Sequence, residues 1–230
     1  MTILDGKKIA EKILRNLRKE IEKKQLKIKL AVILTNRDRV SVSFVRQIKK
    51  GCQRAGVGFK IFELSFKKEI QKVIKDPDNS GIVIVGRKNF SNLIPPEKNV
   101  EKISPVVCAV ERILKEYKIS LRGKNVTLVG RGRLAGRPLA KWLRKKKIKF
   151  SNIDKIKKAD IIISGVGKPG LITGDMVKRG VVVIDIGRDA DFKAISKKAS
   201  YITPLIGGVG PVTVACLLQN LVWMSTCSKK

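Results

Sequence analysis

The sequence predicts an α/β fold in two domains. Short apolar runs that suit buried parallel strands alternate with amphipathic stretches that suit helices, a pattern typical of a parallel sheet covered by helices. The alternation stops at residues 120–124 and then starts again, which places a domain boundary between residues 1–119 and 120–230. With 230 residues, 43% of them hydrophobic, the chain is long and apolar enough to bury a core in each domain.

In the first domain, each element follows from the spacing of apolar residues. Residues 7–24 carry isoleucine and leucine every three or four positions among lysines and glutamates, which predicts an amphipathic helix. Residues 29–34 form a continuous apolar run, as in a strand that is buried on both faces. The same two patterns predict a helix at 42–55, a strand at 60–64, a helix at 69–74, a strand at 81–85 and, after a polar stretch, a helix at 106–117.

The second domain contains a glycine-rich turn between a predicted strand and a predicted helix. Its glycines, Gly130, Gly132 and Gly136, allow a tight turn and let the backbone approach a pyrophosphate. The following helix offers free N–H groups to that anion, and Pro138 suits the first helical turn. This arrangement predicts nucleotide binding. The remaining elements are predicted as strands at 125–129, 161–164 and 181–186 and helices at 137–146 and 212–224.

The choice between NAD and NADP depends on the charges near this turn. An acidic residue about 20 positions further on, at the end of the second strand, would bind the 2′-hydroxyl of NAD. Here residues 148–152, where that strand would lie, are compressed, and Asp154 is the only acid nearby. Arg131 inside the turn, together with Ser151, suits a 2′-phosphate better. We therefore expect NADP as the cofactor, with NAD as the alternative.

Residue counts exclude several kinds of chemistry. The chain has no histidine, which excludes histidine bases, Ser-His-Asp and Cys-His nucleophiles and His-ligated zinc. The cysteines are too far apart for a zinc or redox motif and suit free thiols in a reducing compartment: Cys52, Cys108, Cys216 and Cys227. The N-terminus lacks the apolar core of a signal peptide, and no uninterrupted apolar run has the length of a bilayer span. We expect a cytoplasmic protein with no metal centre and no membrane attachment.

The formal net charge of +32 raises the question of a polyanionic partner. The basic excess, mostly lysine, is spread along the whole chain, and only 5% of the residues are aromatic. Nucleic-acid-binding modules usually interleave aromatic residues with basic ones. Lysine substituted at many indifferent surface sites explains the charge more simply, so we expect any nucleic-acid binding to be non-specific.

Four motifs follow one another in the second half of the chain. They are Gly130-Arg131-x-x-x-x-Gly136-x-Pro138, Val166-Gly-Lys-Pro-Gly170, Val183-Ile-Asp-Ile-Gly187 and Ile202-Thr-Pro-x-x-Gly207-Gly-Val-Gly-Pro211-x-Thr213. This series resembles the methylenetetrahydrofolate dehydrogenase/cyclohydrolase (FolD) family. In the first half, residues 41–52 resemble the family's S-x-x-Y-V-x-x-K-x-x-x-C helix and residues 81–85 its D-G-I-L-V-Q strand. The resemblance covers nearly the whole chain.

The resemblance implies an N-terminal α/β folate domain, a Rossmann-type NAD(P)-binding domain and a C-terminal helix, residues 212–230, that packs back on the first domain. It also implies a homodimer that oxidises methylenetetrahydrofolate with NADP and hydrolyses the methenyl product to formyltetrahydrofolate. By position, the folate derivative would contact Ser41, Phe44, Gly208 and Pro211. The cofactor would contact Gly130, Arg131, Gly132, Gly136, Pro138, Val166, Gly167, Arg188 and Thr213.

The catalytic positions of the family hold different residues in this chain. The family's catalytic lysine corresponds to Ile48, and the tyrosine one helical turn earlier corresponds to Phe44. Its supporting glutamine corresponds to Val85 and a folate-binding aspartate to Glu101. No catalytic residue can therefore be named. Hydrolysis needs acid–base groups that contribute typically about 10²–10⁴-fold, whereas hydride transfer needs mainly alignment, so we expect cyclohydrolase activity to be impaired or absent.

Three functions from different classes follow from these observations. The first is an NADP-dependent methylenetetrahydrofolate dehydrogenase-like enzyme with impaired cyclohydrolase activity. The second is an inactive relative that keeps the fold and nucleotide binding. The third is a basic protein that binds nucleic acid or another polyanion, which only the net charge supports. A dehydrogenase assay separates the first two, and salt-dependent retention on DNA or RNA would favour the third.

Overall fold

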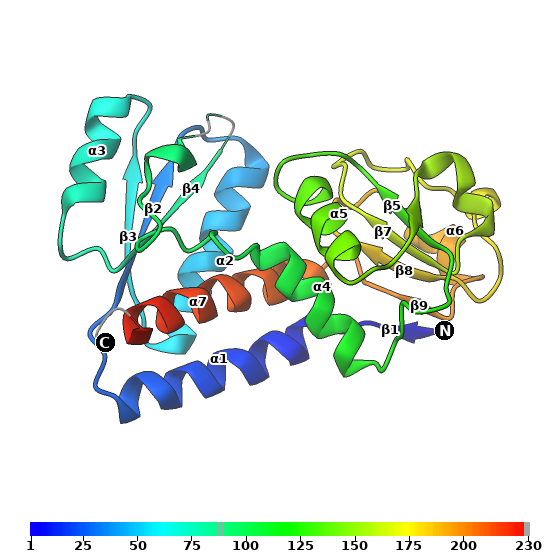
Figure 1. The fold of residues 1–230 in the computed structure, drawn as a ribbon, viewed down its shortest axis with the longest axis horizontal. Coiled ribbons are helices and arrows are strands. Elements are labelled where there is room, and N and C mark those ends of the chain that lie inside the picture. The colour runs from blue at the N-terminus through cyan, green and yellow to red at the C-terminus, as the bar shows by residue number, and fades with distance from the viewer. Residues whose placement is uncertain (87, 89, 228–230) are drawn as a thin grey trace. The chain divides into compact units, whose positions relative to one another are not determined.

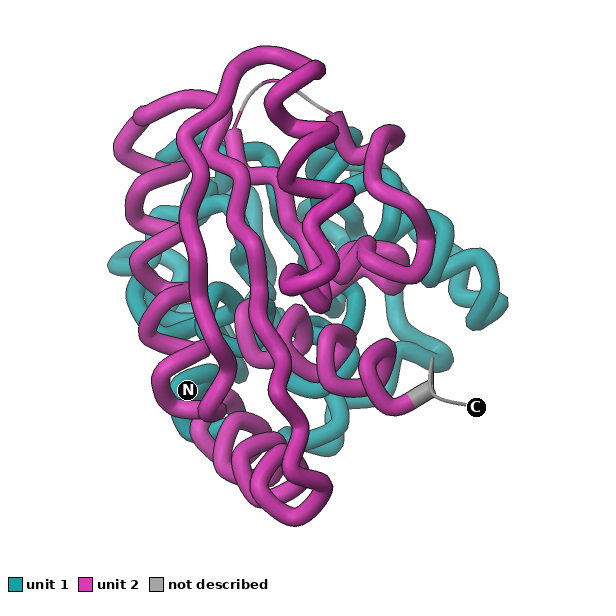
Figure 2. Tube along the Cα trace, turned by 90° about the vertical axis from the view of Figure 1, so that its left-hand side faces the viewer, with its two compact units in different colours: residues 1–9, 106–213 teal, residues 10–105, 214–230 magenta. Residues whose placement is uncertain are grey.

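The computed structural model describes residues 1–86, 88 and 90–227, which form two compact units (Figures 1 and 2). Unit 1 contains residues 1–9 and 106–213, and unit 2 contains residues 10–105 and 214 onward. Two helices, α1 (Gly6–Lys23) and α7 (Val209–Cys227), therefore begin in unit 1 and end in unit 2. By its contacts, α4 (Pro105–Glu116) belongs almost entirely to unit 1. The predicted boundary after residue 119 would instead place this helix in the first domain. The domain boundary stays a prediction.

Unit 1 is built around a six-stranded parallel sheet with the order β1-β9-β8-β7-β5-β6. From β5 the chain passes to β6 at the edge and then returns to β7 on the other side of β5. The order β6-β5-β7-β8-β9 matches strands 2-1-4-5-6 of a Rossmann sheet, as predicted, with its switch point between β5 and β7. The strands are β1 (Thr2–Ile3), β5 (Val126–Val129), β6 (Phe150–Ser151), β7 (Ile161–Ser164), β8 (Val182–Asp185) and β9 (Tyr201–Ile202).

Helical segments cover this sheet and bury its apolar side chains. On one face, Ile162 of β7, Val183 of β8 and Ile202 of β9 belong to a buried cluster that also includes Ile156 and Ile195. The other face of the sheet carries a different set of side chains, because successive side chains of a strand point in opposite directions. The remaining helical segments of this unit are α5 (Gly136–Lys145), η2 (Ile153–Lys158), η3 (Gly174–Met176) and α6 (Phe192–Ser196).

Unit 2 contains a three-stranded parallel sheet with the order β3-β2-β4. Helix α3 packs on one face, in a buried cluster with Ala31, Ile33, Ile82 and Ile84. Val85 alternates with Ile84 and therefore points to the opposite face. The elements are β2 (Lys29–Leu34), α2 (Arg39–Ala55), β3 (Gly58–Glu63), α3 (Lys67–Lys75), β4 (Gly81–Val85) and η1 (Ser91–Leu93).

From Val214 onward α7 packs inside unit 2, as predicted for a helix that returns to the first domain; residues 228–230 of the predicted range lie outside the described residues. A Cβ added at Gly51 of α2 would lie 2.7 Å from Val214 Cγ1, and one at Gly81 of β4 would lie 2.5 Å from Leu221 Cδ1. Asn220 Nδ2 donates hydrogen bonds to two backbone carbonyl oxygens in the segment after β4, each at 2.8 Å. The small size of both glycines therefore lets α7 approach α2 and β4 closely.

Helix α7 is also long and apolar enough, by length and composition, to cross a membrane over Val209–Thr226. In the structure 67% of this window is buried. An apolar helix that is covered on most sides is typical of a protein core.

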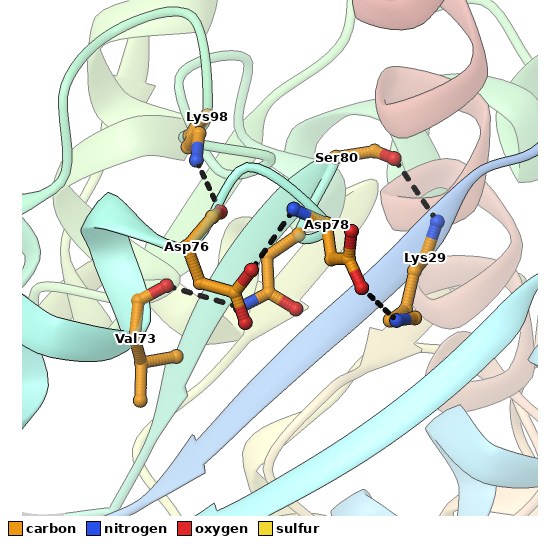
Figure 3. A network of polar contacts seen from close by, with 7 residues as sticks. Lys29, Val73, Asp76, Asp78, Ser80 and Lys98 are labelled. Atoms are coloured by element: carbon orange, nitrogen blue, oxygen red, sulfur yellow. Dashed lines mark hydrogen bonds and ion pairs between the residues drawn. The ribbon is translucent and has the colours of Figure 1, made fainter.

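A polar network joins the loop before β4 to its neighbours at the N-terminal ends of β2 and β4 (Figure 3). The backbone N–H of Lys29 donates to Ser80 Oγ at 3.1 Å, and Lys29 Nζ lies 3.2 Å from Asp78 Oδ2. Lys98 Nζ donates to the carbonyl oxygen of Asp76 at 2.7 Å. The network fixes the end of the sheet that lies opposite Val85.

All the predicted helices and strands are present, with ends shifted by a few residues. Helix α2 begins at Arg39 rather than at residue 42, because the carboxylate of Asp38 caps it by accepting from Ser41 N–H at 2.8 Å. Strands β1 and β9 and helix α6 were not predicted. Two-residue strands and a five-residue helix are too short to produce a periodic pattern.

Candidate functional site

The predicted glycine-rich turn follows β5 at the switch point of unit 1. Gly130 has φ = 113°, which favours glycine, and a Cβ added there would lie 2.9 Å from the carbonyl oxygen of Gly165 after β7. A Cβ at Gly136 would lie only 2.2 Å from the carbonyl oxygen of Gly130. A Cβ at Gly132 would meet no atom within 4 Å. Gly130 and Gly136 therefore shape the turn, while Gly132 faces open space.

The beginning of α5 is suited to an anion. Ala135, which precedes the helix, makes no side-chain cap. The N–H of Arg137 already donates to the carbonyl oxygen of Gly132 at 2.9 Å, and Pro138 has no N–H, so the helix start leaves the N–H of Gly136 for an anion. Three exposed arginines lie in or beside the turn: Arg131, Arg133 and Arg137. Only Arg131 was predicted from the sequence. The helix dipole and the three guanidinium groups together favour a phosphate-bearing ligand, with fewer free N–H groups than the sequence led us to expect.

Ser151, the expected partner of Arg131, is engaged inside the sheet. Its Oγ lies 2.9 Å from Thr127 Oγ1 on the neighbouring strand β5 and donates to the carbonyl oxygen of Val126 at 3.4 Å. The hydroxyl is therefore already hydrogen-bonded between β5 and β6. Of the two residues predicted to suit a 2′-phosphate, Arg131 is the exposed one.

The loop after β7, which contains Val166 and Gly167, donates its N–H groups to a buried carboxylate. Asp189 Oδ2 accepts from Ser164 Oγ at 2.5 Å and from Val166 N–H at 2.8 Å. Asp189 Oδ1 accepts from the N–H groups of Gly167 and Lys168, both at 2.7 Å. Asp189 is fully buried. Its role could not be predicted from the sequence, because a single aspartate has no recognisable pattern.

Arg188 lies in a tight turn after β8. Asp185 accepts hydrogen bonds from the N–H groups of Asp189 at 3.0 Å and Ala190 at 2.9 Å. Burial raises the pKa of the Asp185 carboxyl group. Arg188 itself is exposed and has φ = 62°, a left-handed conformation that is uncommon for a residue with a side chain. The turn thus presents Arg188 to solvent at the same edge of the sheet as the glycine-rich turn.

The predicted Gly208, Pro211 and Thr213 lie at the start of α7, after β9. A Cβ added at Gly6 would lie 1.8 Å from the carbonyl oxygen of Gly208, so the first turns of α1 and α7 meet at these glycines. Thr213 is buried, and its Oγ1 donates to the carbonyl oxygen of Val209 at 3.0 Å. This hydroxyl is therefore bonded within its own helix. Pro211 is half-buried.

The positions that correspond to the family's catalytic groups are apolar and mostly buried in unit 2. Ile48 is 0% exposed and Val85 is 6% exposed, while Phe44 is half-buried. Lys49 and Lys50 are both exposed on another side of α2. Ile48 therefore occupies a core position, and neither neighbouring lysine replaces the missing amine.

Polar groups that sequence analysis did not single out follow β2 and β4. A Cβ at Gly86 would lie 2.3 Å from both Thr35 Oγ1 and Asn36 Oδ1. Asn36 Nδ2 donates to Asp38 Oδ2, and Asp38 also caps α2 next to the buried Ser41. The carboxyl end of this sheet therefore keeps amide, hydroxyl and carboxylate groups beside its apolar catalytic positions.

Glu101 is half-buried in a turn beside β4. The turn is held there by Asn99, two residues earlier, which forms an isolated parallel bridge with Ile82 of β4. Its N–H donates to Asn99 Oδ1 at 2.9 Å. The predicted site residues fall into both units: Ser41, Phe44, Ile48, Val85 and Glu101 belong to unit 2, and all the others to unit 1.

Comparisons with known proteins identify both halves of the chain. Residues 4–101 match the catalytic-domain model of tetrahydrofolate dehydrogenase/cyclohydrolase, and residues 104–229 match its NAD(P)-binding-domain model. The chain is 38% identical to the bifunctional protein FolD of Nautilia profundicola, with 96% of each chain covered. This alignment extends over 275 positions although the chain has 230 residues, so segments of the relative have no counterpart here.

Solved structures show the same similarity. The FolD dehydrogenase/cyclohydrolase of Campylobacter jejuni superposes with a TM-score of 0.88 at 29% identity, and 99% of each chain is covered. The Trypanosoma brucei FolD in complex with NADP and an inhibitor gives a TM-score of 0.90 at 25% identity, with 100% of this chain and 99% of that one covered.

Proposed function

This chain belongs to the tetrahydrofolate dehydrogenase/cyclohydrolase (FolD) family, and from this premise we propose that it is an NADP-dependent methylenetetrahydrofolate dehydrogenase with impaired or absent cyclohydrolase activity. The observation that carries the proposal is the contrast between its two predicted sites. The nucleotide turn keeps its glycines, helix start and arginines. The helix that corresponds to the family's catalytic helix has no ionisable group at the two catalytic positions, Phe44 and Ile48, and Ile48 is fully buried.

The positive charge of the arginines near the glycine-rich turn favours NADP over NAD. Arg131, Arg133 and Arg137 are exposed in or beside the turn that faces the pyrophosphate in a Rossmann domain. The neighbouring strand β6 ends without an acidic residue that would bind a free 2′-hydroxyl. Both cofactors offer a pyrophosphate to these guanidinium groups, but only NADP adds a 2′-phosphate with which one or more of them could pair.

Hydride transfer requires the protein mainly to bind and align its two ligands, and it requires no acid–base side chain. NADP supplies the hydride acceptor, and the protein binds and aligns the two reacting carbons. We assign folate contacts to Ser41, Phe44, Gly208 and Pro211, as the resemblance implies. Hydrolysis requires activation of a water, and Phe44, Ile48 and Val85 offer no group for that task.

A spectrophotometric assay with methylenetetrahydrofolate and either NADP or NAD tests this function. We expect slow formation of NADPH and slower formation of NADH. Binding of NADP without turnover would instead identify an inactive relative. Failure to bind nucleotide, combined with salt-sensitive retention on DNA, would support the polyanion-binding alternative. A homodimer and a cytoplasmic location stay predictions, and sedimentation equilibrium tests the first.

A further inference from the structure

The carboxylate of Asp189 fills the place where a bound anion would lie. Three consecutive N–H groups, those of residues 166–168, converge on it together with Ser164 Oγ. Successive backbone N–H groups of this kind form anion-binding concavities in proteins. Each carboxylate oxygen of Asp189 accepts two of the four hydrogen bonds, so the group is saturated.

The loop that Asp189 holds forms one side of the switch point. A Cβ at Gly165 would lie 2.9 Å from Ala135 Cβ, which belongs to the turn after β5. A Cβ at Gly130 would in turn lie 3.2 Å from Val166 Cγ2. The loop and the nucleotide turn are therefore packed against each other with no spare space, and a displaced loop would also alter this contact.

The two sides of the switch point face different halves of a dinucleotide. In a Rossmann sheet the pyrophosphate lies at the first turn, and the adenosine half lies toward the second strand, which here is β6. The nicotinamide half must then extend toward β7, where residues 165–168 lie. Since Asp189 occupies the N–H groups of residues 166–168, these groups are not available to a phosphate.

We propose that Asp189 is a positioning residue for the nicotinamide half of the cofactor, an inference that rests on the proposed NADP binding. Asp189 is fully buried and would act through the backbone, without touching the cofactor. It fixes the backbone of residues 166–168 in one conformation, so that the exposed outer side of this loop is already shaped for the nicotinamide half. Loss of the carboxylate leaves the N–H groups unpaired, and the loop must rearrange to satisfy them.

Calorimetric binding of two ligands to Asp189→Asn tests the proposal. The substitution keeps the shape of the side chain but sets an amide NH₂ against two of the four donors. NADP contains both halves of the cofactor, whereas 2′,5′-ADP lacks the nicotinamide half. We expect the Kd for NADP to rise about tenfold or more and the Kd for 2′,5′-ADP to stay within about twofold.

The matched control is Asp160→Asn in the same unit. Asp160 accepts from Asn125 N–H at 2.7 Å and from Lys178 Nζ at 2.6 Å, at the opposite end of the sheet. This variant should lose thermal stability but keep the affinity of the unmodified protein for both ligands. Equal weakening of both ligands by Asp189→Asn, or an unchanged Kd for NADP, would overturn the proposal. If the unmodified protein binds neither ligand, the proposed function itself fails.

Ser164→Ala provides the milder test if Asp189→Asn does not fold. It removes one of the four donors to the carboxylate and leaves the other three in place. We expect a two- to fivefold rise in the Kd for NADP, because about one net hydrogen bond is lost, and no change for 2′,5′-ADP. An unchanged Kd for NADP in this folded variant would contradict the role of Asp189.

Discussion

A Cβ at Gly136 would lie 2.2 Å from the carbonyl oxygen of Gly130, whereas a Cβ at Gly132 would meet nothing within 4 Å. The turn therefore contains two glycines that the fold requires, Gly130 and Gly136, and one, Gly132, that only a ligand would require. Gly132→Val should fold normally but weaken NADP binding about tenfold or more, because the branched side chain enters the space of the pyrophosphate. Calorimetry with thermal unfolding measures both effects.

Gly136→Ala is the matched contrast to Gly132→Val. Its methyl group would collide with the backbone, so we expect a loss of about 1–3 kcal/mol in unfolding free energy. Unchanged NADP affinity in folded Gly132→Val protein would show that the turn does not bind the cofactor.

Replacement of Arg131 tests the choice of cofactor. Arg131→Ala removes a guanidinium group that we expect to pair with the 2′-phosphate, a group that NAD lacks. We expect the Kd for NADP to rise about five- to twentyfold and the Kd for NAD to change less than twofold. Lys141→Ala, a replacement on the exposed surface of α5, controls for the loss of one positive charge. Equal losses for NADP and NAD would remove the reason for preferring NADP.

Restoration of the family's residues tests the loss of hydrolysis. Phe44→Tyr, Ile48→Lys and Val85→Gln together should raise cyclohydrolase turnover, since they return a hydroxyl, an amine and an amide to the catalytic helix and strand. Ile48→Lys alone should gain little, because its amine would be buried among apolar side chains, where its pKa falls.

The single variant should also be less stable by about 3 kcal/mol or more, since it buries a cation without a partner. Denaturant unfolding measures this loss. A triple variant that folds and binds methenyltetrahydrofolate but does not hydrolyse it would show that more than these three groups is missing.

The reactivity of the Cys52 thiol tests whether the core of unit 2 excludes solvent. Burial raises the pKa of the Cys52 thiol from 9.0 to about 12. Because folding favours the neutral thiol, its contribution to stability is complete below pH 9 and is lost as the pH rises toward 12. Only the thiolate reacts with iodoacetamide, so alkylation of Cys52 at pH 8 should be at least about 100-fold slower in the folded protein than in urea. Mass spectrometry of the peptide measures it, and comparable rates would contradict the burial.

Most of the fold could be predicted because its longer elements carry their own periodic signal. The apolar run of β2 and the amphipathic spacing of α1 each identify one element from local sequence alone. The glycine-rich turn was predictable for the same reason, since its glycines lie between a strand and a helix within a few residues.

The contacts between distant segments could not be predicted in this way. Asp189 meets the loop after β7 more than 20 residues earlier, and Gly6 meets Gly208 from the other end of the chain. Ser151 was expected to face a ligand, but its hydroxyl bonds across to Thr127 on a neighbouring strand. These contacts depend on how strands are ordered in the sheet, which local spacing does not encode.

Methenyltetrahydrofolate is the product of hydride transfer and the substrate of hydrolysis, so its concentration during one reaction shows most directly whether the two activities have separated. The measurement follows NADPH and methenyltetrahydrofolate together after NADP and methylenetetrahydrofolate are mixed with the protein, at a pH where spontaneous hydrolysis is slow. We predict that methenyltetrahydrofolate accumulates in step with NADPH, because Phe44, Ile48 and Val85 cannot activate water. Formation of NADPH with formyltetrahydrofolate, and without accumulated methenyltetrahydrofolate, would contradict this prediction.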